Sequence, residues 1–449
     1  MKIWIRRIIS IALIIAVILP VQKLVVPKYA NGVLEGTFTP EYYNEKYNHQ
    51  VLMIGDCEAY ENYSPMVLWK KYGITSYIRG NAQQLAWHGY YLLKEALERG
   101  EKPDIVIFSV LALKYNQPQK EEYNRVLFDY MKPSLTKLQA LSASMMPETE
   151  DEETGETIDK EHYLDYIFPI LRYHSRLSEL EDDDFTYYGK IKQHTIAGYY
   201  MRCDVLPVGA DEEEEEDIEE LEEEPYEEES EEESEIVLEV PELEELELEP
   251  LDESEIEEIE VLEEYEESET EEEILEETEE LEETEEYEES EEEDEEEDET
   301  EIPEGDLPLG DNAMSYLDKI RELCEQKNIP LILIKAPSIY PVWYEKWEQQ
   351  IEDYAAQYKL PYLNYLEMAD EIGIDWNTDT YDGGLHMNIY GAEKCADHLG
   401  QYLKDHYELA DMREDPEISA DWAEKEAFYE AKKADQLEQI KEHGKVLDP

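Results

Sequence analysis

Short apolar runs alternate with amphipathic stretches in two parts of the chain, residues 45–210 and 306–411. Buried-type strands are predicted over 51–54, 74–78, 104–110, 331–334 and 362–366. Apolar positions at helical spacing predict helices over 66–72, 85–99, 311–327, 342–358 and 390–407. Strands that alternate with helices in this way are typical of a parallel sheet with right-handed crossovers, so the pattern indicates an α/β domain.

The stretch from 116 to 210 is less regular. Helical patterns cover 123–141 and 163–179, and an acidic loop is predicted near 148–156. We expect a partly helical excursion here that covers one side of the sheet.

An acidic segment, residues 211–305, lies between the two α/β parts. Of the 90 positions from Asp211 to Thr300, 58 are Asp or Glu and none is Lys or Arg. Like charges at this density repel, and the sparse apolar residues cannot offset the ordering entropy, which predicts a long disordered insertion or transient helix. Because the strand and helix pattern resumes after it, the segment interrupts one domain. Its role stays open between a solvated spacer and a weak site for Ca²⁺ or cationic polymers.

The formal net charge of the 449 residues is −82, and the residues outside Asp211–Thr300 still carry −24. Phosphate binding needs a dense positive surface, and the sequence shows none, so no nucleic acid partner is expected and anionic lipid headgroups are disfavoured. Four scattered cysteines without CxxC spacing exclude a disulfide scaffold, although one bridge stays open. The charged, helix-prone tail, residues 412–449, is expected to bury little.

Residues 1–30 predict a membrane anchor. Arg6 and Arg7 precede an apolar run from Ile8 to Val21, which reaches ~20 residues, the length of a membrane span, when Leu24–Val26 is included. No small-residue cleavage motif follows, which favours an uncleaved anchor over a removed signal peptide. The paired arginines predict a single-pass protein of the cell membrane with its bulk outside the cytoplasm.

Small and polar residues follow predicted strands at two places and precede the last predicted helix at a third. These segments are Gly55-Asp56-Cys57-Glu58, Arg79-Gly80-Asn81 and Asp382-Gly383-Gly384-Leu385-His386-Met387-Asn388. The carboxyl ends of parallel strands meet at one edge of a sheet, where α/β proteins place their sites. We therefore expect the three segments to form one cleft.

The three segments together resemble the SGNH/GDSL hydrolase superfamily. A narrower resemblance, to the membrane-anchored SGNH-like proteins of Firmicutes related to DltD and the alginate-acetylation group, is carried by the phrases SPMVLWKKYGITSYIRGNAQQ, KAPSIYPVWYEKW and DGGLHMNIYGAEK. The resemblance covers about residues 51–113 and 311–407, and not the acidic segment. It implies a flavodoxin-like three-layer sandwich with a central parallel sheet, and ester hydrolysis or acyl transfer without a cofactor.

By this resemblance, Cys57 stands where the family has its nucleophilic serine. His386 would withdraw the thiol proton, and Asp382 would hold the imidazole in the required tautomer. The backbone N–H groups of Cys57 and Gly80, with the Asn81 amide as a candidate replacement for the family's oxyanion Asn, would bind the oxyanion.

Two departures from the family pattern bear on catalysis. The family's Asp usually lies three residues before the His, whereas Gly383 occupies that position here and Asp382 lies four before; Asp379 is a weaker substitute. The third family block, Gly-x-Asn-Asp, is replaced by residues 108–113, so its oxyanion Asn is absent. Losing one such donor costs on the order of 10²–10³ in turnover.

Structural roles compete with the catalytic ones. Cys57 could be a small buried residue, and His386 a histidine bonded locally at a helix entrance. Asn388 is expected to cap the last helix, and Asn81 could equally cap the helix that begins near Gln83. Four tryptophans at helical spacing are expected in the core: Trp69, Trp87, Trp343 and Trp347. The remaining histidines, including His88 and His174, lack ligand spacing, so no metal is predicted.

Two functions are consistent with these residues. The first is a membrane-tethered, extracytoplasmic ester hydrolase or acyltransferase that acts on an acylated cell-envelope polymer or glycan, with a membrane-bound acyltransferase as a further partner. The second is a catalytically inactive SGNH-like binding or scaffold protein of the cell envelope, which the cysteine and the missing Asn favour. The sequence leaves both open.

Overall fold

The computed structural model of the chain describes residues 2–29, 33–118, 120–145, 149–150, 157–158, 161–209 and 307–447. The acidic segment and most of the loop predicted at 148–156 lie outside these residues. The expectation of disorder in the acidic segment therefore stays a prediction.

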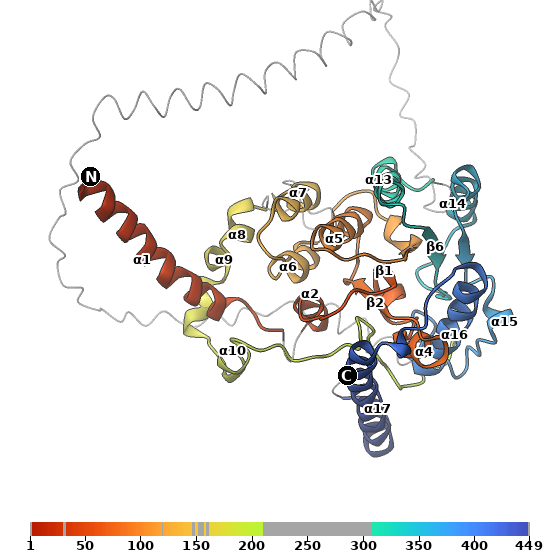
Figure 1. Cartoon of the computed structure of the whole chain (residues 1–449). Coiled ribbons are helices and arrows are strands. Elements are labelled where there is room, and N and C mark those ends of the chain that lie inside the picture. The colour runs from red at the N-terminus through yellow and green to blue at the C-terminus, as the bar shows by residue number, and fades with distance from the viewer. Residues whose placement is uncertain are drawn as a thin grey trace, which may run out of the picture. The chain divides into compact units, whose positions relative to one another are not determined.

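Five parallel strands form the central sheet: β1 (Val51–Gly55), β2 (Ser76–Gly80), β3 (Ile105–Ser109), β6 (Leu331–Lys335) and β7 (Tyr362–Asn364). Their order is β2-β1-β3-β6-β7, and all neighbouring pairs are parallel (Figure 1). Because β3 pairs with β6, residues on both sides of the acidic segment build one sheet. A separate antiparallel pair consists of β4 (Thr149–Glu150) and β5 (Thr157–Ile158).

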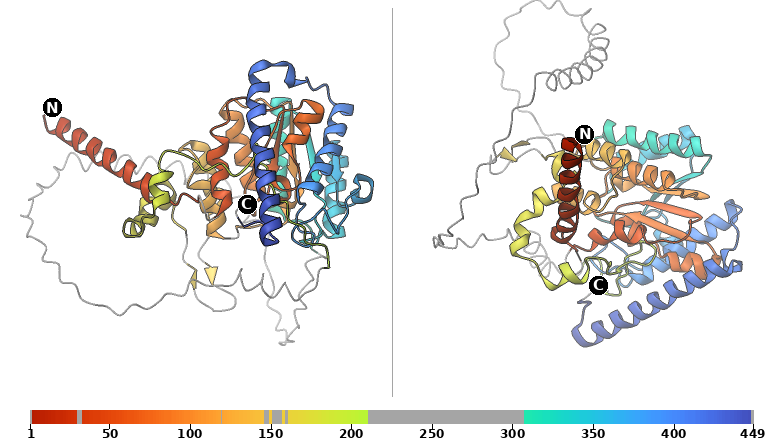
Figure 2. Two further views of the ribbon diagram at one scale, coloured as in Figure 1. Left: turned by 90° about the horizontal axis from the view of Figure 1, so that it is seen from below. Right: turned by 60° about the vertical axis from the view of Figure 1, so that its left-hand side comes forward.

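Helices cover both faces of the sheet, which gives three layers (Figures 1 and 2). One layer contains α5 (Ala86–Glu98), α13 (Asp311–Lys327) and α14 (Glu345–Tyr358), with α7 (Leu135–Ser144) against α5. The other contains α4 (Pro65–Tyr72) and α16 (Ile389–His406), which pack against each other. Every residue of β1, β2, β3 and β6 is buried, as expected of a parallel sheet covered on both faces. The predicted α/β architecture with three layers is thus confirmed.

Shorter elements and the two terminal helices complete the described structure. They are α1 (Lys2–Val25), η1 (Leu34–Thr37), α2 (Phe38–Tyr42), α3 (Cys57–Tyr60), η2 (Val110–Leu113), α6 (Glu121–Phe128), α8 (Tyr163–Ile167), α9 (Ile170–Tyr173), η3 (His174–Ser178), α10 (Asp182–Thr186), α15 (Ala369–Ile372), η5 (Met412–Glu414) and α17 (Pro416–His443). The carboxyl end of α1 packs against α9, α10 and η3. Among the residues described, no helix combines the length and apolarity needed to cross a membrane.

Some predicted boundaries were wrong. The second strand begins at Ser76 and not at Ile74, because Gly73 adopts a left-handed conformation (φ 68°) and the N–H of Ile74 donates to the Leu68 carbonyl at 3.1 Å, which closes α4. The helix predicted over 123–141 is divided into α6 and α7, because Ser134 caps a new helix by accepting a hydrogen bond from the Lys137 N–H at 3.0 Å.

The prediction that the tail buries little was also wrong. Trp422 and Tyr429 of α17 are each 2% exposed, and the Trp422 ring stacks on Trp69 with centroids 5.1 Å apart. Figure 2 shows α17 lying along the outside of the layer that contains α4. The helix is therefore part of the folded domain. The tryptophans predicted in the core are buried there, except Trp343, which is partly buried against it.

Candidate functional site

Cys57 lies at the carboxyl end of β1, where the strand turns into α3. Asp56 is the N-cap of α3, and its carboxylate accepts a hydrogen bond from the Glu58 N–H at 3.2 Å. A side chain at Gly55 would place its Cβ 2.5 Å from the Cβ of Ser109, so only glycine fits between β1 and β3. The cap and the close approach fix Cys57 at this edge of the sheet. Cys57 retains partial exposure, and it is a free thiol, as are the other three cysteines.

His386 lies in the loop before α16 and is held by Asp382. The imidazole Nδ1 lies 2.6 Å from Oδ2 of Asp382, and the His386 N–H donates to Oδ1 at 2.8 Å. Gly383 and Gly384 have φ angles of 74° and 108°, which turn the chain so that a carboxylate four residues earlier reaches the ring. The Thr380 hydroxyl donates to the His386 carbonyl at 2.8 Å and supports the same loop.

The structure brings Cys57 and His386 together. Their side chains interact closely enough for each to shift the pKa of the other. Nε2 of His386 is buried and makes no hydrogen bond of full geometry with any described residue, so the contact with the thiol is not an aligned hydrogen bond. Such loose geometry is common in catalytic pairs without substrate. Asn62 ties the two loops together, because its Oδ1 accepts from the Met387 N–H at 2.7 Å and its Nδ2 donates to Ser338 Oγ at 3.3 Å.

A second carboxylate, that of Glu61, faces the same imidazole. Glu61 Oε2 lies 3.9 Å from His386 Nδ1 and accepts a hydrogen bond from the Tyr381 hydroxyl. The Tyr381 ring also stacks on the imidazole at 6.0 Å between centroids. Burial raises the pKa of Glu61 to about 7, against the opposing influence of His386.

The charges around the thiol favour its protonated form. Burial raises the pKa of Cys57 to about 12; His386 opposes this shift, and the carboxylates of Asp56 and Glu61 add to it. Burial disfavours a charge on His386, but Glu61, Cys57 and Asp382 outweigh it and raise the pKa of the imidazole well above its usual value. Burial, reinforced by Glu58, raises the pKa of Asp56 to about 7. These shifts favour the protonated thiol of Cys57 and the charged form of His386.

The three candidate oxyanion donors differ in their environment. Gly80 is paired with Gly55 across the sheet, and a Cβ at Gly80 would lie 2.5 Å from Cδ1 of Tyr60, so a glycine is required there. The Asn81 amide donates to the carbonyls of Ala82 at 3.1 Å and Tyr123 at 3.3 Å. The Asn81 amide is thus already engaged by backbone carbonyls, whereas the N–H groups of Cys57 and Gly80 stay candidates for the oxyanion site. Asn81 does not cap α5, whose N-cap is Leu85.

Two further assignments are settled by the same geometry. Asp379 contacts the ammonium of Lys394 and accepts a hydrogen bond from the Asp375 N–H at 2.7 Å, so it is bonded to residues other than His386. Asn388 caps α16 as predicted, because its Oδ1 accepts from the Tyr390 N–H at 3.0 Å.

A buried ion pair that the sequence pattern did not predict lies directly behind the site. Lys335, the last residue of β6, donates to Glu58 Oε1 at 2.6 Å, and the side chains are 0% and 1% exposed. A lysine that ends the apolar run LILIK was the available signal. Glu61 was missed as well, although its position four residues after Cys57 in CEAYE places both on one side of a helical turn.

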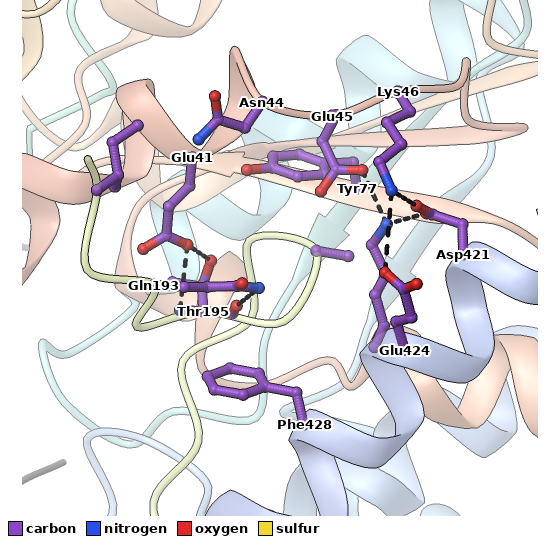
Figure 3. Close-up of a pocket in the computed structure, with 13 residues that line it drawn as sticks. Glu41, Asn44, Glu45, Lys46, Tyr77, Gln193, Thr195, Asp421, Glu424 and Phe428 are labelled. Carbon is purple, nitrogen blue, oxygen red and sulfur yellow. Dashed lines mark hydrogen bonds and ion pairs between the residues drawn. The ribbon is translucent and has the colours of Figure 1, made fainter. Parts of the chain in front are cut away.

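Figure 3 shows a pocket of about 220 Å³ that none of the candidate catalytic residues lines. Its charged groups are satisfied within the protein: Lys46 lies 3.1 Å from Asp421, and Glu41 accepts from the Thr195 N–H at 3.1 Å. These contacts connect α17 and the chain around 193–195 to the region of α2. The pocket is therefore better explained as a seam between elements than as a substrate site.

Cys57 follows β1, Gly80 ends the neighbouring strand β2, and His386 and Asp382 come from the loop before α16. No protein-family model, curated protein or solved structure matches the chain. The resemblance therefore depends on the quoted motifs alone, and the roles of Cys57, His386 and Asp382 depend on their geometry.

Proposed function

We propose that this chain is a membrane-tethered, extracytoplasmic SGNH-like enzyme that transfers or hydrolyses acyl groups, with Cys57 as nucleophile. The observation that carries the proposal is the His386 ring, held on Nδ1 by Asp382 at 2.6 Å with its Nε2 buried and the Cys57 thiol beside it. This order of nucleophile, base and orienting acid is the arrangement that activates a nucleophile on unrelated folds.

The chemistry follows from these positions. Neutral His386 accepts the thiol proton as sulfur attacks the acyl carbonyl, and the N–H groups of Cys57 and Gly80 stabilise the oxyanion. The carbon–oxygen bond of the ester then breaks, the imidazolium protonates the leaving alkoxide, and the acyl group remains on sulfur. Attack by water on this thioester gives hydrolysis, whereas attack by a hydroxyl of an envelope polymer or glycan gives transfer. A thioester suits transfer from a membrane-bound acyltransferase.

The protonation states set the pH range of this reaction. His386 can act as a base only when it is neutral, and its raised pKa moves that form to higher pH. The rising limb of activity is therefore expected above pH ~6.5, the midpoint of an unperturbed histidine.

The location is supported by the sequence at the start of the chain. The apolar run that follows Arg6 and Arg7 falls within α1, whose 24 residues give a helix about 36 Å long at 1.5 Å per residue. The proposed anchor depends on this apolar run in the sequence, and its basic flank favours an extracytoplasmic position for the remaining chain. The acidic segment then extends into the envelope as a solvated insertion.

The nucleophile is tested by trapping the acyl group. The full chain is incubated with p-nitrophenyl acetate, and intact mass and peptide mapping locate the acetyl group. Acetylation of Cys57 that hydroxylamine removes supports the proposal, and Cys57→Ala should abolish it while Cys203→Ala, a change at a buried cysteine, should not. Equal acetylation of Cys57→Ala and the parent would contradict covalent catalysis at this residue.

Asp382 and Asp379 provide a matched comparison for the orienting acid. Asp382→Asn removes the acceptor at Nδ1 and should slow acyl-enzyme formation by about 10⁴-fold, as loss of the orienting carboxylate does in other triads. Asp379→Asn loses the contact of a buried carboxylate with Lys394, and when circular dichroism shows that the variant is folded, its rate should stay within about threefold of the parent, because Asp379 shares no hydrogen bond with His386. Rates measured by stopped-flow release of p-nitrophenol decide between them, and equal losses would rule out a special role for Asp382.

A binding protein that retains the scaffold is the second candidate. The observation that favours it is the thiol with a pKa of about 12 together with the Asn81 amide already bonded to two carbonyls. Under this function, Cys57→Ala leaves glycan binding unchanged, and the parent forms no acyl thioester at any pH between 6 and 10.

A further inference from the structure

A cavity of about 450 Å³ lies at the carboxyl end of α1, apart from the Cys57 site. Five of the residues that line it are lysines, namely Lys23, Lys28, Lys132, Lys190 and Lys192. One carboxylate, that of Asp129, also lines it, and that carboxylate contacts Arg125 and accepts a hydrogen bond from the Tyr173 hydroxyl. The cavity thus gathers positive charge in a strongly acidic chain. We call it the lysine cavity.

Three of these ammonium groups have aromatic or no protein partners in place of carboxylates. Lys23 lies over the Tyr188 ring at 4.9 Å, and Lys132 lies over the Tyr43 ring at 4.2 Å. Neither they nor Lys190 forms an ion pair with a described residue. Some lysines elsewhere in the described chain do pair with carboxylates, as Lys71 does with Asp397 at 2.9 Å and Lys425 with Glu45 at 3.0 Å. Cations left unpaired around one cavity favour an anionic ligand.

Lys28 places a further positive charge at the same end of α1. Its ammonium donates to the carbonyls of Lys23 at 2.7 Å and Leu24 at 3.1 Å, and so caps the last turn of the helix. Burial lowers its pKa to about 8, with Asp184 opposing the shift and Arg176 and Lys23 adding to it. The negative end of the helix dipole is therefore neutralised, and the surrounding lysines are left to face the cavity.

The position of the cavity indicates which anion it would meet. It surrounds the end of the proposed anchor, and tyrosines at 43, 130, 187 and 188 line it together with the lysines. Tyrosine and lysine are the side chains that membrane proteins place at the headgroup level, where basic residues recognise lipid phosphates. Figure 1 shows this end of α1 beside α9 and α10, which contribute to the same surroundings.

We infer that the lysine cavity binds the phosphate group of an anionic phospholipid at the outer surface of the membrane. The phosphate chemistry follows from the lysines, whereas the lipid as its source rests on the proposed anchor. The net negative charge of the whole chain disfavours binding to such headgroups. At this site, however, folding concentrates the lysines. No step of the acyl chemistry at Cys57 depends on the cavity.

The test uses the full chain in a neutral detergent. Calorimetry compares dihexanoyl phosphatidylglycerol, dihexanoyl phosphatidylcholine and inorganic phosphate, with both lipids below their micelle concentrations. The acidic segment is present in every sample. The variant Lys132→Glu/Lys190→Glu changes two exposed lysines of the cavity, and Lys102→Glu/Lys327→Glu changes two exposed lysines far from it by the same total charge.

Phosphatidylglycerol should bind more tightly than phosphatidylcholine, and the cavity variant should weaken it by about tenfold or more while the control variant does not. Equal binding by both variants, or equal binding of the two lipids, would overturn the site. Inorganic phosphate that binds as tightly as phosphatidylglycerol would overturn the lipid as the source. Thermal melts of both variants show that they are folded, and acetylation of Cys57, measured in parallel, reports separately on the proposed enzyme.

Discussion

Cys57 is surrounded by more acidic groups than basic ones, and this balance determines what its thiol can do. Asp56 and Glu61 both raise the pKa of the thiol, and His386 alone among the nearest groups lowers it. The nucleophilic form is therefore scarce at neutral pH. Attack by sulfur therefore requires that neutral His386 accept the thiol proton as the acyl carbonyl is attacked.

Glu61→Gln should make Cys57 reactive at lower pH. Removing the carboxylate takes away one group that raises the thiol pKa, so thiolate forms earlier as pH increases. The rate of Cys57 alkylation by iodoacetamide, followed by mass spectrometry of its peptide from pH 6 to 11, should show a lower midpoint than in the parent.

The matched control is Glu352→Gln, an exposed carboxylate on α14 remote from the thiol. Its alkylation profile should coincide with that of the parent. If the alkylation profile of Glu61→Gln also coincides with that of the parent, the Glu61 carboxylate does not affect the pKa of the Cys57 thiol. Asp382 alone would then hold the imidazole.

At the scale of elements, the loop before α16 allows Asp382 to reach the imidazole, although it lies four residues before His386 and not three. Both glycines have positive φ, but they differ in surroundings: a Cβ on Gly383 meets open space, whereas one on Gly384 would lie 2.8 Å from Cγ2 of Val208. Gly383→Ala should therefore destabilise the fold by about 1–2 kcal/mol through backbone strain alone. Gly384→Ala should cost about 2–3 kcal/mol, because a clash adds to the strain.

Urea unfolding of the two variants measures this difference. The order of the two losses is the decisive result, because both substitutions add the same methyl group to adjacent residues. A larger loss for Gly383→Ala would mean that the loop does not have the conformation described.

Helix α17 should contribute measurably to stability. Trp422→Ala removes a side chain that is 2% exposed and stacked on Trp69, and a loss of about 3–5 kcal/mol is expected in urea unfolding. Leu437→Ala, at a residue of the same helix that is 40% exposed, should cost about 0.5 kcal/mol. Similar losses for the two would mean that α17 does not pack on the domain.

Periodicity predicted the sheet better than it predicted the helix ends and the tail. Apolar runs such as 51–54 identify a strand because both faces are buried, but Ile74 is apolar for another reason, its place in the cap of α4. The burial of Trp422 depends on a partner more than 350 positions away, Trp69, which no local pattern reveals. In the site, spacing indicated Cys57 and the loop that carries His386 and Asp382, whereas Glu61 needed the fold to bring it to the imidazole.

At the scale of the whole molecule, the segment that carries most of the negative charge is not the part of the chain that builds the sheet. Outside Asp211–Thr300 the chain carries −24 of its −82, and there its sheet continues directly from β3 to β6. The domain therefore requires only that the two ends of the segment are connected, because the described sheet contains none of its residues. The lysine cavity is a second sign of this separation, since positive charge is concentrated locally in a chain with a large negative total.

Replacing residues 211–300 by a Gly/Ser linker of about 30 residues should therefore preserve the domain. A linker of that length has a mean span of roughly 30 Å, enough to cross one face of a domain of this size. Removing the segment's 58 negative charges reduces self-repulsion, so the thermal midpoint should stay the same or rise. The pH profile of Cys57 alkylation should match that of the full chain, because the groups that set the thiol pKa all lie in the retained parts. A shifted profile, or loss of cooperative melting by circular dichroism, would show that the acidic segment contributes to the fold or to the site, and a spacer role would then be untenable.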